Sequence, residues 1–126
     1  MNSFVLTVGK DEYRIAMPTQ QAVEAEKRLG TSLFDALEHA DQASVQSVML
    51  WAGLQKFNHK MTLEKVYGLM DQMMEEGLSI GGTRYEEYAI DARSALCTEI
   101  LKAAGFFTSE MSADIDEKME KAKENL

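Results

Sequence analysis

Residues that end helices and residues that begin them alternate along this chain. This order of helix stop and start signals limits the folds that the chain can adopt. Gly30, Gly77 and Gly105 each follow a run with helical apolar spacing, where a glycine can close a helix in the left-handed conformation. Ser32 and Thr62 precede new runs, where their hydroxyls can cap free N–H groups. The chain therefore favours several short helices. They are predicted at about 20–29, 32–40, 44–57, 62–77 and 84–104, with one more in the tail.

The first 17 residues show a different pattern, in which apolar and polar residues alternate. This period of two is typical of strands with one buried face, so we predict a β-hairpin over 3–17. An isolated hairpin is marginal in water, and this one must pack on helices. Pro18 blocks further strand pairing, and Thr19 can cap the first helix. The apolar members of the hairpin are Phe4, Leu6, Val8, Tyr13, Ile15 and Met17.

Two further segments shape the expected architecture. The helix at 44–57 has apolar residues around most of its surface, which predicts a central position. The sequence S-I-G-G at 79–82 is the best candidate for a mobile joint. Thr83 and Glu86 have the spacing of a capping box, which predicts that the longest helix begins at Arg84.

Composition narrows the class of protein. At 126 residues the chain fits one domain, and its net charge of −8 repels nucleic-acid phosphates. The single Cys97 excludes an internal disulfide and suggests a reducing compartment. No 18-residue apolar run predicts a membrane span, and the N-terminus has no secretion signal. We expect a cytoplasmic protein that binds neither nucleic acid nor membrane.

These patterns predict a mainly α fold: a single-domain bundle of about five to six helices with a short N-terminal hairpin. The helical domain is expected to cover residues 1–107. Residues 108–126 contain six acids and three lysines, for a net charge of −3, and only a thin apolar stripe. We expect them to form a charged, partly ordered tail helix, because an isolated helix of this length is marginal unless it docks.

The chain carries few residues with catalytic or metal-binding potential. Ser32, Asp35 and His39 are the residue types of a hydrolase triad at helical spacing, but a helix cap beside an exposed Asp–His pair explains them better. His39 and His59, the only histidines, lie on separate elements and form no zinc motif. Gly81–Gly82 lacks the lysine of a phosphate-binding loop. We expect no catalytic residue, metal or cofactor.

Large apolar residues are the stronger functional signal. The chain has nine methionines, and methionine-rich surfaces adapt to many partners. Most of these residues must form the core, but an exposed remainder would mark an interaction site. The candidate partner-binding residues are Trp51, Leu54, Phe57, Met70, Met73, Met74, Tyr85, Tyr88, Phe106 and Phe107.

The sequence also resembles the small tail assembly chaperones of long-tailed phages, in the branch found in siphophages and prophages of Gram-positive bacteria. The resemblance covers about residues 4–107. It rests on F-V-L-T-V-G-K-D-E-Y-R-I, A-V-E-A-E-K-R-L-G-T-S-L-F-D-A-L, W-A-G-L at 51–54, M-T-L-E-K-V at 61–66 and E-E-G at 75–77. These are structural signatures, and some members of this mostly helical family lack the hairpin.

The resemblance implies a function without catalysis. Such chaperones bind the long, apolar, helical tape measure protein in the bacterial host cytoplasm, recruit tail tube subunits, and leave before the virion is complete. Several form curved or spiral homo-oligomers, and many have a longer frameshifted form. The resemblance supplies no site residue. A small helical adaptor or regulatory module with another partner is the alternative that the same residues allow.

Overall fold

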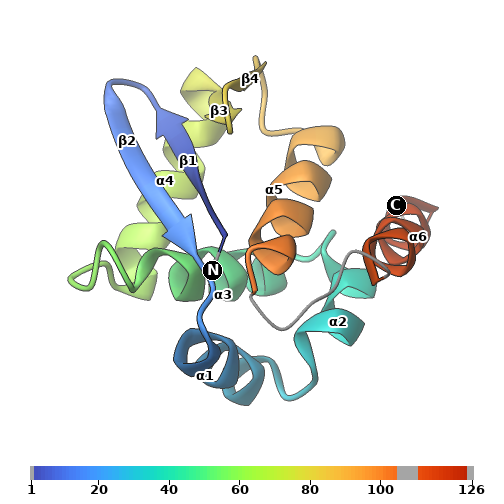
Figure 1. Cartoon of the computed structure of the whole chain (residues 1–126). Coiled ribbons are helices and arrows are strands. Elements are labelled where there is room, and N and C mark those ends of the chain that lie inside the picture. Colours follow the sequence, from blue (N-terminus) through green and yellow to red (C-terminus); the bar gives the residue numbers. More distant parts are fainter. Residues whose placement is uncertain (1, 105–110, 125–126) are drawn as a thin grey trace.

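The computed structural model describes residues 2–104 and 111–124 and, within the second range, the side chains of 117–122 and 124. Helices dominate a mixed α/β fold with a four-stranded antiparallel sheet of order β2-β1-β3-β4 (Figure 1). The elements are β1 Ser3–Val8, β2 Asp11–Ala16, α1 Thr19–Leu29, α2 Leu33–Ala36, the 3₁₀ turn η1 Leu37–His39, α3 Ala43–Leu54, α4 Leu63–Glu76, β3 Leu78–Ile80, β4 Thr83–Tyr85, α5 Ile90–Lys102 and α6 Met111–Glu124.

The predicted hairpin is confirmed. Strands β1 and β2 pair in antiparallel register from Ser3 opposite Ala16 to Val8 opposite Asp11. Leu6, Val8 and Ile15 are fully buried, as the alternating pattern predicted. Burial of this face against the helices stabilises a hairpin that would be marginal alone.

The segment predicted as a mobile joint forms two further strands, and this prediction is wrong. β3 pairs with the free edge of β1, and the Gly81 N–H donates to the Val5 carbonyl at 2.9 Å. Gly81 and Gly82 both have positive φ, which allows the tight turn into β4. Residues 78–85 thereby satisfy backbone groups of β1 that would otherwise lie unpaired.

The predicted start of the longest helix is also wrong. Thr83 and Arg84 lie in β4, and α5 begins only at Ile90. Instead of closing a capping box, Glu86 accepts a hydrogen bond from Arg84 Nε at 3.4 Å. The capping pattern was outweighed because strand pairing satisfies the same backbone groups more completely.

Most of the other helix boundaries follow the predicted signals. Gly30 ends α1 with φ 73°, in the left-handed conformation. Ser32 and Thr62 cap α2 and α4 by accepting the backbone N–H groups of Asp35 and Lys65. Two details differ: α1 begins after Pro18 without a side-chain cap, and α3 ends at Leu54 rather than at about residue 57. The tail helix is present as α6, while the predicted domain boundary at 107–108 lies outside the described residues.

Helix α3 is the central element. It contacts α1, α4, α5 and β2, and most of its residues are buried. Its close approach to the sheet depends on Gly53, where an added Cβ would lie 2.8 Å from Cγ2 of Ile15 and 3.6 Å from Cγ2 of Ile100. Only a residue without a Cβ lets α3 fit between the hairpin and α5 at this point.

We expect Gly53→Ala to lower the free energy of unfolding by about 1–3 kcal/mol, because the added methyl overpacks the core. Gly68→Ala in α4 is the matched control, since nothing lies within 4 Å of the Cβ position there. It should raise stability by about 0.5–1 kcal/mol, the helix-propensity gain of alanine over glycine. Urea unfolding followed by Trp51 fluorescence measures both. Equal effects in the two variants would disprove the close packing at Gly53.

Candidate functional site

One face of α4 carries an exposed apolar stripe. Thr62 and Gly77 fix the two ends of this helix. Tyr67 and Met74 lie two helical turns apart and are 51% and 50% exposed. Met70 and Asp71 lie between them on the same face, Met70 mostly buried. Large apolar side chains with this exposure are few among the described residues. The stripe is therefore a candidate interaction surface.

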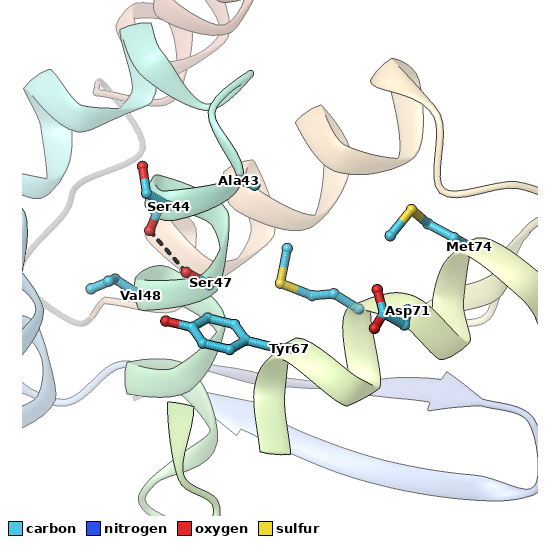
Figure 2. A pocket seen from close by; sticks show the side chains of 8 residues that line it. Ala43, Ser44, Ser47, Val48, Tyr67, Asp71 and Met74 are labelled. Atoms are coloured by element: carbon cyan, nitrogen blue, oxygen red, sulfur yellow. Dashed lines mark hydrogen bonds between the residues drawn. The ribbon is translucent and has the colours of Figure 1, made fainter. Parts of the chain in front are cut away.

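The stripe forms one wall of a groove between α4 and α3 (Figure 2). The groove has a volume of about 330 Å³. Figure 2 shows the Tyr67 ring extending from α4 toward Val48 and Ser47 of α3, with Asp71 and Met74 farther along α4. The complete lining is Ala43, Ser44, Ser47, Val48, Tyr67, Met70, Asp71 and Met74.

The polar groups of the groove are few. The Ser47 hydroxyl donates to the Ser44 carbonyl at 3.0 Å, so its proton is already used within α3. Asp71 is the single carboxylate of the lining. An apolar groove with one carboxylate is suited to apolar side chains of a partner, and it favours a cation beside them.

The structure divides the predicted partner-binding residues into four groups. Met74 and Phe57 are exposed, and Trp51 and Tyr85 are partly buried against the core. Phe106 and Phe107 lie outside the described residues. The other four are core residues with exposed fractions of 7% or less, among which Met70 also reaches the lining of the groove: Leu54, Met70, Met73 and Tyr88.

Helix geometry explains this division. Val66, Leu69 and Met73 form the inward stripe of α4, while Tyr67 and Met74 form the neighbouring outward one. The two stripes differ by one position, and both are apolar, so spacing alone cannot distinguish them. For the same reason, the sequence did not reveal that Tyr67 and Val48 lie at the surface of the groove. The only sign of them in the sequence was that each belongs to a helix with more apolar positions than one face can bury.

Two other aromatic rings are partly covered by cations of the same chain. The Arg28 guanidinium lies 4.4 Å from the centroid of the Trp51 ring, and Lys56 Nζ lies 5.7 Å from that of Phe57. Such cation–π contacts stabilise exposed rings modestly. Trp51 therefore contributes to local packing between α1 and α3 in addition to any surface role.

The residues weighed for a hydrolase triad have structural roles. Ser32 Oγ accepts the Asp35 backbone N–H at 3.0 Å, as a helix cap does. The Asp35 carboxylate accepts a hydrogen bond from Lys118, and His39 is exposed. Within the described part of the chain, no cluster of three or more His, Cys, Asp or Glu could hold a metal ion. Among the same residues, no helix is long and apolar enough to cross a membrane.

Cys97 and Tyr88 are buried ionisable residues close to each other. Burial raises the pKa of the Cys97 thiol to about 12. Burial also raises the pKa of the Tyr88 hydroxyl, which donates to Gln46 Oε1 at 3.3 Å. Arg93 lies over the Tyr88 ring at 4.9 Å and donates to the Tyr88 carbonyl. This network fixes the start of α5 on α3, and the thiol is held neutral.

Comparison with known proteins yields no relative, since no protein-family model, curated protein or solved structure matches the chain.

Two neighbouring methionines test the assignment of the α4 faces. Met73→Glu should lower the free energy of unfolding by about 3 kcal/mol or more, because it places an unpaired charge in the core. Met74→Glu, one residue further on, should change it by no more than about 0.5 kcal/mol. Thermal and urea unfolding of the two variants measure both changes in the free energy of unfolding. Comparable destabilisation by both would mean that the outward stripe is wrongly assigned.

Cys97 should be unreactive in the folded protein. Raising its pKa from 9.0 to about 12 reduces the thiolate at pH 8, on the order of a thousandfold, and burial further restricts access. Alkylation by iodoacetamide, followed by mass spectrometry, should therefore be complete in urea and negligible in buffer. Rapid labelling of the native protein would contradict the buried position.

Proposed function

We propose that this protein is a phage or prophage tail assembly chaperone that binds helices of the tape measure protein without catalysing a reaction. The observation that carries the proposal is the exposed apolar groove between α3 and α4, bordered by Tyr67 and Met74. Its two walls are single helical stripes, Ala43 to Val48 and Tyr67 to Met74. A third amphipathic helix can lay its apolar face into such a groove.

Charge supports the same proposal. The chain has a net charge of −8, and the groove carries the carboxylate of Asp71. A long apolar helical partner aggregates when it is uncovered, and a coat of acidic subunits keeps the complex soluble by mutual repulsion. The resemblance in sequence implies the tape measure protein as the partner, which has the required length and helical character.

The size of the groove suggests how such a complex forms and dissolves. A volume of about 330 Å³ is at the lower end of the roughly 300–1,000 Å³ typical of ligand pockets. Each copy therefore holds only a few partner side chains and binds weakly. Many copies along one tape measure chain supply avidity, and each remains replaceable by a tail tube subunit. Homo-oligomers and action in the host cytoplasm belong to the same proposal.

Co-expression with the tape measure protein of the same phage or prophage tests the proposal. Affinity purification should recover the tape measure protein in soluble form. Recovery of the tail tube protein in the same complex would further support the proposal. Met74→Glu should reduce this recovery at least fivefold, because a second carboxylate beside Asp71 disrupts the apolar wall. Quantitative mass spectrometry of the purified complex gives the readout.

Val23→Glu is the matched control, since Val23 on α1 is 42% exposed but lies outside the groove. It should leave recovery of the tape measure protein unchanged. Recovery that is insensitive to Met74→Glu would remove the groove from the proposal. Recovery of a different stoichiometric partner would instead support a small helical adaptor.

A further inference from the structure

Helix α6 is held on the rest of the protein by a lysine. Lys118 Nζ donates to Glu38 Oε1 at 3.0 Å and to Asp35 Oδ1 at 3.4 Å. The same ammonium lies 4.5 Å from the centroid of the Phe34 ring. Lys121, one turn further along α6, approaches Glu38 at 3.9 Å. We define the α6 seat as Phe34, Asp35 and Glu38 together with the rest of turn η1.

Apolar side chains of α6 also take part in this contact. Among the described side chains of α6, only Met119 and Ala122 are buried, and they follow Lys118 on the inward face. Figure 1 shows α6 beside α2 and α5, apart from the sheet, and α6 packs against η1 and α5.

The core is closed before α6 begins. Ala103 and Ala104 are buried, and Ala104 forms a parallel bridge with Met17 at the end of the hairpin. Of the buried hydrophobic cluster, Met119 is the single member contributed by the described part of α6.

The ion pairs lie at the protein surface. The Asp35 and Glu38 side chains are 65% and 35% exposed, while that of Lys118 is 17% exposed. The hydrogen bond from Lys118 lowers the pKa of the Glu38 carboxyl, and that pairing raises the pKa of Lys118. Contacts of this kind specify which helix fits, but they are individually weak and are screened by salt.

We propose that the α6 seat is a binding site for an amphipathic partner helix with a lysine beside a buried apolar residue, and that α6 occupies this site in cis. The pattern that fits is shown by α6 itself: K-M-E-K-A at 118–122, with two lysines three residues apart around one methionine and an alanine four residues after the first lysine. A partner helix with this pattern satisfies the two carboxylates and the Phe34 ring in the same way.

The seat is separate from the groove of the proposed function. None of its residues lines the space between α3 and α4. The protein therefore has two helix-binding surfaces, one open and one occupied by its own chain. Occupancy in cis reduces the apparent affinity for a partner helix by the fraction of time that the seat is free.

The experiment uses the full-length protein with Lys118→Glu and a fluorescent synthetic peptide of residues 111–124 as the probe. The carboxylate introduced at position 118 repels Glu38. Amide hydrogen exchange of residues 117–122 should therefore rise at least tenfold, while exchange of α3 stays unchanged. Fluorescence anisotropy should then show the peptide binding the variant at least tenfold more tightly than the wild type. The same peptide carrying Lys118→Glu should bind neither protein.

Two further variants control for charge alone. Lys60→Glu makes the same charge change at an exposed lysine outside the seat, and it should leave exchange and peptide binding as in the wild type. Glu38→Lys combined with Lys118→Glu reverses the main pair and should restore protection of α6. If Lys118→Glu disturbs α3 as well, wild-type protein in 1 M salt provides the second measurement. There, faster exchange confined to α6 is expected.

Three results would overturn the proposal. Unchanged exchange of α6 both in Lys118→Glu and in 1 M salt would show that the ion pairs do not hold the helix. Equal peptide affinity for variant and wild type would show that the vacated seat takes no helix. Self-association of the wild type that is lost in Lys118→Glu would assign the seat to a second copy of this chain instead of a partner helix.

Discussion

The packing of α3 between the hairpin and α5 is the constraint on which the rest of the structure depends. Gly53 brings its backbone against Ile15 of β2 and Ile100 of α5, and the adjoining residues of α3 fill the core. Because α3 also contacts α1 and α4, four elements take their positions from one helix. The orientation of α4 on α3 then decides which of its apolar stripes remains outside.

The exposed groove follows from that arrangement. Val66 and Met73 are used in the core, so Tyr67 and Met74 are left on the outer side of the same helix. The groove therefore needs no special motif, only a helix with more apolar residues than one face can bury. A protein that must recognise many similar amphipathic helices gains from such a surface, because apolar contacts tolerate variation in the partner.

The two proposed helix-binding surfaces rely on different interactions. The α3–α4 groove offers apolar area with one carboxylate, whereas the α6 seat holds a lysine between Asp35, Glu38 and the Phe34 ring. The first depends little on salt, and the second depends on it strongly. An acidic chain that binds helices by both means can respond separately to the shape and to the charge of a partner.

Local signals in the sequence determined the hairpin and the helix ends at Gly30 and Gly77, because turn and cap preferences act within a few residues. They failed at 79–86, where the decisive partner is β1, more than 70 residues earlier in the chain. Which methionines are exposed was decided only by the tertiary structure, since adjacent stripes of α4 are equally apolar and differ only in what packs against them.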